Sequence, residues 1–258
     1  MGGFILQGAR SVGVRWLGDR MNIEFAGKVV VVAGGTGGLG RAVSLAFLEA
    51  GAKVIATYHS DAEFVALKAA TGQNPSLEGY LVDVTDESVV AGMVSAVVKQ
   101  HGALDALVNT VGGYAGGVKF WDLETKVLDR MLDLNLRSGY VLARAVLPIM
   151  LKAGHGSIVN VAAKAAVDHG AGAAAYAASK AAAVAMMDSL AADAMGTGVR
   201  VNSILPSIID TPANRKAMPG ADFDSWPKPD ELAQVILFLS SDFSRSIHGA
   251  AIPVYGNR

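Results

Sequence analysis

The sequence predicts an α/β fold built on a doubly wound parallel sheet of about seven strands, with helices on both faces. Apolar runs of strand length alternate along the chain with segments of helical periodicity. The strands are expected to begin near Lys28, Lys53, Gly79, Asp105, Gly156, Val199 and Ala250. A chain of 258 residues, 52% of them hydrophobic and 17% charged, is long and apolar enough for one domain with a substantial core.

The first predicted strand, residues 29–33, is an uninterrupted apolar run that ends in a glycine-rich turn, and a helix is expected to follow from Arg41 to Ala50. Strand, glycine turn and helix in this order typically bind a nucleotide. The glycines let the backbone approach a pyrophosphate, and the helix N-terminus favours its charge. The spacing is Gly34-x-x-x-Gly38-x-Gly40, not the usual Gly-x-Gly-x-x-Gly. The sequence thus predicts a single-domain Rossmann-type fold with cofactor contacts from Gly34, Thr36, Gly37, Gly38, Leu39 and Gly40.

The end of the second predicted strand bears on cofactor choice. An acid there would bind the ribose 2′-hydroxyl and select NAD, but this chain offers Tyr58, followed by His59. A 2′-phosphate is therefore tolerable, and His59 or Ser60 can hydrogen-bond it, although no arginine stands there and Asp61 is close. We predict NADP or dual use of NADP and NAD. The alternative for His59 is an exposed loop histidine without a role.

Tyr176 and Lys180 are the candidate proton-transfer pair. They lie in an alanine-rich stretch that is expected to be helical, and positions i and i+4 share one helix face. A nearby cation favours the ionised phenol and lowers its pKa from about 10, which makes it usable near neutral pH. A lone Tyr-x-x-x-Lys is common and does not by itself indicate catalysis. The predicted nucleotide-binding turn upstream is what favours a catalytic role for this pair.

Taken together, these segments resemble the short-chain dehydrogenase/reductase family over nearly the whole chain from Lys28 onward. The resemblance implies that Asn135, in Leu134-Asn135-Leu136, joins Tyr176 and Lys180 as a catalytic residue. Asn109-Thr110-Val111-Gly112 partly matches the family's Asn-Asn-Ala-Gly segment, and Ser207 replaces a family glycine. The further cofactor contacts implied are Asp83, Val84, Asn109, Val111, Gly112, Tyr176, Lys180, Pro206, Ile209 and Thr211.

The departure from the family is its catalytic serine, whose position is taken here by Ala163. Ser157 opens the fifth predicted strand and lies too far back to substitute. A serine at that position hydrogen-bonds a substrate carbonyl, and losing one such donor costs about 10²–10³ in rate. Either alcohol–ketone chemistry is impaired, or the substrate does not need that donor.

A narrower resemblance favours the second account. Ala163-Lys164-Ala165-Ala166 with Tyr176 and Lys180, the loop 111–117 and the segment 211–226 are similar to the quinonoid dihydropteridine reductase branch of the family, which also lacks the serine. The resemblance implies hydride transfer to a small conjugated substrate, with Tyr176 as proton donor and Asn135 holding a relay water. It also implies an NADH preference, against the prediction from the second strand. Candidate substrate contacts are Tyr114, Ala163, Phe223 and Trp226, and plain packing is the alternative for the aromatic residues.

Two other functions stay open at this point. One is a carbonyl or alcohol oxidoreductase that lacks the usual serine, and the other is a largely non-catalytic NAD(P)-binding protein. Retention of Asn135, Tyr176 and Lys180 argues against the second of these.

Composition excludes several other classes. A formal net charge of −1 gives no reason to expect nucleic acid or an acidic membrane as partner. The absence of cysteine excludes disulfides and thiolate metal sites, and the five histidines show no metal-ligand spacing. Residues 1–20 are expected to be a disordered extension, with the family-like domain over 21–258. We expect a cytoplasmic protein, and the family resemblance implies a homodimer or homotetramer.

Overall fold

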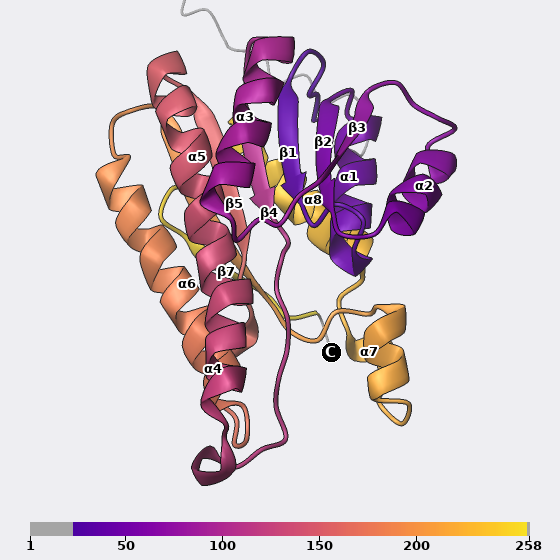
Figure 1. Cartoon of the computed structure of the whole chain (residues 1–258), viewed down its shortest axis with the longest axis vertical. Coiled ribbons are helices and arrows are strands. Elements are labelled where there is room, and N and C mark those ends of the chain that lie inside the picture. The colour runs from indigo at the N-terminus through magenta and orange to yellow at the C-terminus, as the bar shows by residue number, and fades with distance from the viewer. Residues whose placement is uncertain (1–22, 257–258) are drawn as a thin grey trace, which may run out of the picture.

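The computed structural model describes residues 23–256, and its seven strands form one sheet in the order β3-β2-β1-β4-β5-β6-β7 with every neighbouring pair parallel (Figure 1). The strands are β1 (Val29–Ala33), β2 (Lys53–Tyr58), β3 (Leu77–Leu81), β4 (Ala106–Asn109), β5 (Gly156–Val161), β6 (Val199–Pro206) and β7 (Ala251–Val254). Each begins within two residues of the expected position, so the predicted α/β class and strand sequence are confirmed.

Eight α-helices and several shorter turns connect the strands in the described residues. The helices are α1 (Gly38–Glu49), α2 (Asp61–Ala70), α3 (Glu87–His101), α4 (Thr125–Leu132), α5 (Ser138–Ala153), α6 (Ala174–Asp193), α7 (Pro212–Ala217) and α8 (Pro229–Ser240). The single-turn 3₁₀ segments are η1 (Phe120–Asp122), η3 (Lys164–Ala166), η4 (Phe223–Ser225) and η5 (Asp242–Ser244). A π-helical turn, η2 (Asp133–Arg137), joins α4 to α5.

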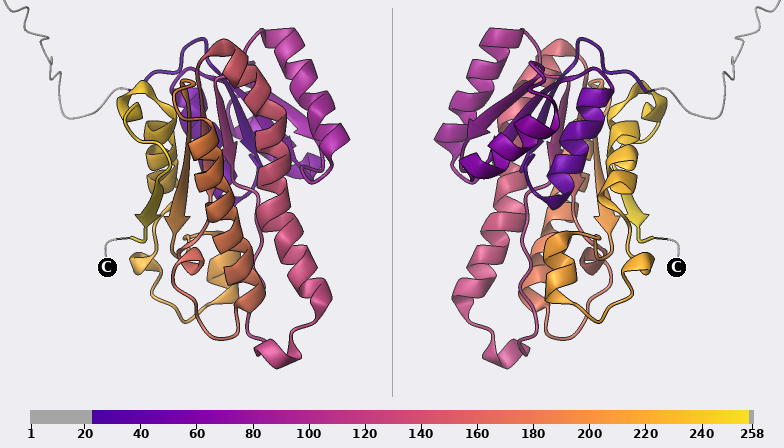
Figure 2. Two further views of the ribbon diagram at one scale, coloured as in Figure 1. Left: turned by 90° about the vertical axis from the view of Figure 1, so that its left-hand side faces the viewer. Right: turned by 90° about the vertical axis from the view of Figure 1, so that its right-hand side faces the viewer.

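The alternation of side chains along β1 divides the core into two layers. Val30 and Val32 pack with α1 and α8 on one face, while Val29, Val31 and Ala33 pack with α3, α5 and α6 on the other. The two views of Figure 2 show these helix layers from either side. Because both faces are covered, all five residues of β1 are fully or nearly fully buried, as its uninterrupted apolar run predicts.

The strand order places the functional segments at one edge of the sheet. From β1 the chain adds β2 and then β3 on one side and then returns to place β4 on the other side of β1, so the order in which strands are added reverses between β1 and β4. In an open parallel sheet, ligands bind beyond the carboxyl ends of the strands at such a reversal. The glycine turn after β1 and the segment after β4 both lie there.

The expected extension over residues 1–20 lies outside the described residues. Within residues 23–256, no helix is long and apolar enough to cross a membrane, and no cluster of three or more histidine, aspartate or glutamate side chains is placed to hold a metal ion.

Candidate active site

The turn after β1 is held closed by hydrogen bonds that only glycines permit. Gly34 has a positive φ of 71°, donates its N–H to Thr57 Oγ1 at 2.9 Å, and accepts from the N–H of Gly37 at 3.0 Å. A Cβ on Gly40 would lie 2.0 Å from the carbonyl oxygen of Gly34. The turn therefore requires glycine at 34 for its backbone conformation and at 40 for the close approach of helix and turn.

The first turn of α1 fits a phosphate group. Its N-cap residue is Gly37, and no side chain caps the helix, so the first backbone N–H groups are open to a ligand. Leu39 is buried beneath the turn and anchors it in the core, while a Cβ on Gly38 would lie 2.9 Å from Thr211 Cγ2. The structure thus brings the predicted residues of the turn together with Thr211, which is about 170 positions later in the sequence.

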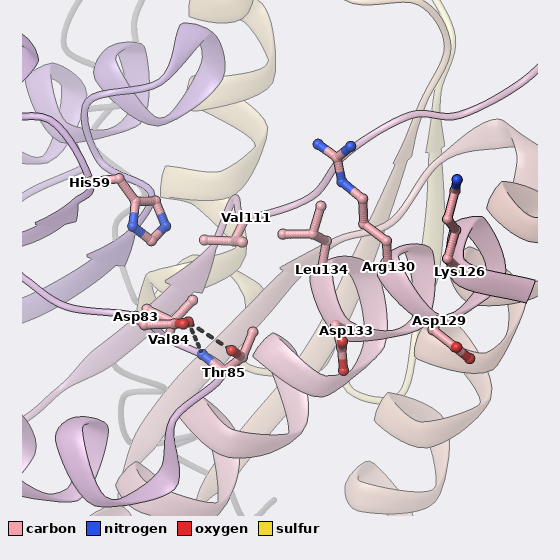
Figure 3. A pocket seen from close by; sticks show the side chains of 10 residues that line it. All are labelled: His59, Asp83, Val84, Thr85, Val111, Lys126, Asp129, Arg130, Asp133 and Leu134. Carbon is pink, nitrogen blue, oxygen red and sulfur yellow. Dashed lines mark hydrogen bonds between the residues drawn. The ribbon is translucent and has the colours of Figure 1, made fainter.

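A cavity of about 470 Å³ has Val111 in its wall (Figure 3), and a Cβ on Gly34 of the turn would lie 3.1 Å from Val111 Cγ2. Four of the residues predicted to bind the cofactor line it, namely His59, Asp83, Val84 and Val111. Thr85 donates its hydroxyl and its backbone N–H to Asp83 Oδ1 at 2.7 and 2.9 Å, and these bonds, helped by His59, lower the pKa of Asp83. The sequence did not predict the part of the wall formed by Thr85, Lys126, Asp129, Arg130, Asp133 and Leu134.

The end of β4 is fixed by two side chains. Asn109 donates from Nδ2 to Asn160 Oδ1 at 3.0 Å and accepts from the backbone N–H of Val111 at 3.1 Å. Thr110 donates its hydroxyl to the carbonyl oxygen of Ala33 at 2.7 Å. The threonine in this partial match therefore ties β4 to the end of β1, close to the glycine turn.

Asn135 lies in the π-helical turn η2 and is almost completely buried. Its Oδ1 accepts from the N–H of Gly113 at 2.9 Å, and its Nδ2 donates to the carbonyl of Gly113 at 3.0 Å and to Ser179 Oγ at 2.9 Å. Protein groups therefore use the amide that the sequence suggested would hold a relay water. The side chain clamps the loop after β4 to helix α6, and π-turns are frequent at functional sites.

Lys180 lies in α6 and is 5% exposed, with Nζ donating to the carbonyl of Val161 at 2.9 Å. Burial lowers its pKa to about 8. A Cβ on Gly112 would lie 3.0 Å from Lys180 Nζ and 2.8 Å from Asn135 Oδ1. The loop after β4, η2 and α6 therefore meet at one point.

The pKa of Tyr176 differs from the sequence-based expectation. The sequence predicts that Lys180 lowers this pKa, but burial raises it to about 12, with a smaller contribution from Tyr114. Desolvation penalises the phenolate, and Lys180 is itself buried and bonded to Val161, so it does not offset that cost in this structure. Tyr176 is therefore held protonated over the physiological range, the form that a proton donor needs.

Ala163, at the position of the family's serine, is buried immediately before η3. The hydroxyl of Ser179 donates to the carbonyl of Tyr176 at 2.8 Å, and that of Ser207 donates to the carbonyl of Tyr255 at 2.7 Å. Both serines are already engaged with the protein, so neither replaces the missing donor.

The three predicted substrate aromatics lie in different environments. Tyr114 is 70% exposed and meets the ring of Tyr176 edge-on, with centroids 5.0 Å apart. Trp226 is buried and packs against Phe223 at 5.0 Å, while Arg215 lies over the Phe223 ring at 4.7 Å. Packing inside its own loop thus accounts for Trp226.

Asp210 forms two ion pairs that fix the segment after β6. Its carboxylate bonds Arg215 and Lys228, and these hydrogen bonds keep its pKa well below the usual range. Pro206 ends β6, and the carbonyl of Ile209 accepts from Asn214 Nδ2 at 2.8 Å. Thr211 caps α7, so the predicted contacts Pro206, Ile209 and Thr211 belong to one braced turn.

Three contributors were not singled out from the sequence. Thr57 accepts a hydrogen bond from Gly34 in the glycine turn, and Ser179 accepts one from Asn135. In the sequence, Ser179 is recognisable only as a polar residue inside the Tyr176–Lys180 motif. Glu63, at the start of α2, accepts a hydrogen bond from Thr36 Oγ1 at 2.9 Å. No local sequence signal connects Glu63 to a turn 27 residues earlier.

Comparisons with known proteins agree with this geometry. A family model described as short chain dehydrogenase matches residues 28–221. The chain is 34% identical over 243 residues to 3-oxoacyl-acyl-carrier-protein reductase FabG of Thermotoga maritima, covering 91% of this chain and 98% of the relative. It is 35% identical to D-threitol dehydrogenase of Mycolicibacterium smegmatis, covering 89% and 92%. The crystal structure of gox2181 superposes with a TM-score of 0.84 at 30% identity, covering 91% and 96%.

Proposed function

The chain belongs to the short-chain dehydrogenase family of NAD(P)-dependent oxidoreductases, and on that premise we propose that it is a reductase of a small conjugated substrate of the quinonoid dihydropteridine class. The proposal assigns Tyr176 as the proton donor. Lys180 and Asn135 complete the catalytic group, and Ala163 stands where the family places its serine.

One observation carries the proposal: the site keeps buried Asn135 and Lys180 and a protonated Tyr176 but has no serine hydroxyl at position 163. A ketone substrate needs a donor there for its developing oxyanion. A conjugated ring that takes its proton on nitrogen does not build up charge on a carbonyl oxygen. The residues present therefore suit the second kind of acceptor better than the first.

The nicotinamide cofactor supplies the hydride when it is bound, and the chain supplies position and a proton. We assign the pyrophosphate to the first turn of α1, the adenosine to the cavity beside Asp83 and Val111, and the carboxamide to the turn at Ile209 and Thr211. Lys180 would hold the ribose of the nicotinamide, and Asn135 would position Gly113 and α6. For cofactor identity the proposal carries forward NADP or dual use of NADP and NAD.

Support for the pteridine class comes from the three segments that resemble that branch, residues 111–117, 163–166 and 211–226. Of the aromatic candidates, the exposed ring of Tyr114, in contact with Tyr176, is best placed to stack on a flat heterocycle. Phe223 lies in the segment 211–226, and Arg215 already covers its ring.

A second function is favoured by the relatives, which are named as a 3-oxoacyl reductase and a polyol dehydrogenase. It is a carbonyl or alcohol oxidoreductase in which water or backbone replaces the serine hydroxyl. The third candidate, a largely non-catalytic NAD(P)-binding protein, can use Lys180 and Asn135 for binding and packing but has no need of the Tyr176 phenol.

The deciding experiment measures NADH and NADPH oxidation with freshly generated quinonoid dihydropterin, with the uncatalysed rate subtracted and Tyr176→Phe alongside. Rapid turnover that falls in the variant supports the proposal. Turnover of a ketone or alcohol panel in place of the pterin supports the second function. Cofactor binding by fluorescence titration without turnover of either substrate class supports the third.

A homodimer or homotetramer is part of the same proposal. Tyr140 and Leu151 leave apolar side chains 44% and 41% exposed on α5, one of the helices that the family resemblance places between subunits. Light scattering after size-exclusion chromatography would give the mass in solution. Cytoplasmic location stays a prediction from the sequence.

A further inference from the structure

A carboxylate reaches the tip of the glycine turn from the helix that follows β2. Thr36 Oγ1 donates to Glu63 Oε2 at 2.9 Å, and both side chains are at the protein surface. Thr36 is the only residue of the turn 34–40 with a polar side chain. The single side-chain donor of the turn is therefore already bonded to an acid.

The start of α2 is built to keep Glu63 in this place. Ser60 caps the helix by accepting from the backbone N–H of Glu63. The rings of Tyr58 and Phe64 stack at 4.7 Å with an interplanar angle of 6°, which fixes the first turn of α2 against the end of β2. The end of β2 carries no acid, but Glu63 provides one in the first turn of α2.

The charge on Glu63 has no cationic partner within the described part of the chain, since no lysine, arginine or histidine forms an ion pair with it. His59, the candidate partner for a 2′-phosphate, lies close enough to Asp83 to lower the pKa of that carboxyl. Asp61 interacts with Tyr58 and helps burial to raise the pKa of that phenol. Of Asp61, Glu63 and Asp83, Glu63 is the acid that accepts a hydrogen bond from the glycine turn.

We propose that Glu63 sets the cofactor preference of this protein by opposing a 2′-phosphate at the glycine turn while accepting a hydrogen bond from a free 2′-hydroxyl. A phosphate monoester carries a charge between −1.5 and −2 near neutral pH, so an unpaired carboxylate beside it is repulsive. A carboxylate retains acceptor capacity for a hydroxyl after bonding Thr36. Dual use is then biased toward NAD. The inference rests on the nicotinamide-dependent function proposed above.

The test replaces Glu63 by glutamine, which keeps an acceptor for Thr36 and removes only the charge. Dissociation constants for NAD⁺ and NADP⁺ are measured by titration calorimetry at about 20 mM and about 500 mM salt. We expect Glu63→Gln to tighten NADP⁺ binding about tenfold at low salt and to change NAD⁺ binding less than about twofold. High salt should shrink the difference, because the pair is exposed and screened.

Asp61→Asn is the matched control, since it removes the same charge two residues earlier from an acid that faces Tyr58 and not the turn. It should leave the ratio of the two affinities unchanged. An equal shift in both variants would overturn the inference in favour of a general surface field, and an unmoved ratio in Glu63→Gln would overturn it outright.

The binding readout separates this inference from the proposed function. A shifted affinity ratio without substrate turnover would uphold the role of Glu63 and reject the reductase. Substrate turnover with an unchanged affinity ratio in Glu63→Gln would support the reductase and reject the role of Glu63. If neither dinucleotide bound the wild-type protein, both would fail.

Discussion

The two ends of the candidate cofactor site differ in the solvent exposure of their polar and charged side chains. At the hydride end, Lys180 is 5% exposed and Asn135 is 2% exposed. At the adenosine end, His59, Glu63 and Asp83 are all exposed. Burial moves the pKa values of Lys180 and Tyr176 by about two units or more, whereas the pKa of Asp83 is lowered mainly by its hydrogen bonds to Thr85.

This difference implies that the buried end governs the rate of the reaction and the exposed end governs cofactor affinity. Electrostatic interactions are strong in a low-dielectric interior and are screened at a surface. Substitutions at the buried end should therefore change rates by orders of magnitude, and those at the exposed end should change affinities modestly and with salt. The glycine turn lies between the two ends and should affect both.

The largest effect is expected from Tyr176→Phe at the buried end. Removing the phenol removes the proton donor, which should lower turnover about 10³-fold while cofactor affinity changes less than about threefold. Steady-state rates and fluorescence titration would measure the two quantities. Tyr140→Phe, an exposed tyrosine on α5, is the control. Unchanged turnover in Tyr176→Phe would show that another group donates the proton.

Gly40→Ala should remove binding at both ends together. Its Cβ would lie 2.0 Å from the Gly34 carbonyl and 2.7 Å from Thr110 Oγ1, so the turn must move. We expect cofactor affinity to fall about 100-fold, with a loss of about 1–3 kcal/mol in the free energy of unfolding. Gly92→Ala, on the exposed face of α3 with no atom within 4 Å of the added Cβ, is the matched control. Unchanged cofactor affinity in Gly40→Ala would mean that the turn is not the phosphate site.

Lys180→Met should stabilise the protein at neutral pH. The folded-state pKa of Lys180 is about 8, against 10.5 for a free lysine. Between these values the unfolded chain binds more protons, so the cost of the buried cation is complete below pH 8 and disappears as pH rises toward 10.5. The variant should be more stable by about 2–3 kcal/mol at pH 7 in urea unfolding, and less so at pH 9.5.

The exposed Lys152→Met serves as control for this measurement, since it should change neither the stability nor its dependence on pH. If wild type and Lys180→Met gave parallel pH dependences, the buried ammonium would not be the cause, and the contrast between the two ends would weaken.

The smallest effect is expected from Ala163→Ser, which restores the hydroxyl found in most of the family. Reduction of ketones should rise about tenfold, less than the 10²–10³ lost when a donor is removed from a site evolved around it. Pterin turnover should change little. Ala165→Ser, two residues on in η3, is the control. A large loss of pterin turnover in Ala163→Ser would show that the substrate packs directly on Ala163.

Much of the fold could be predicted from local sequence. The run Val29–Ala33, the glycines that follow it and the i, i+4 spacing of Tyr176 and Lys180 are short-range patterns, and each reports an element that forms much as expected. Several expectations about side-chain environments changed, among them the relay-water role of Asn135, whose amide is bonded to Gly113 and Ser179. The pKa of Tyr176 is raised, because burial depends on what packs around the ring, and Trp226 is buried within its own loop.

By itself, the sequence determined the parallel sheet, the glycine-rich turn and the family, because strand hydrophobicity, glycine conformation and helix periodicity are properties of neighbouring residues. Only the tertiary structure decided that Asn135 clamps Gly113 to α6, that Lys180 is desolvated, and that Glu63 faces Thr36 across 27 residues of chain. The physical reason is that hydrogen-bond partners and dielectric environment are set by groups brought together by the sheet, and no local pattern records which groups those are.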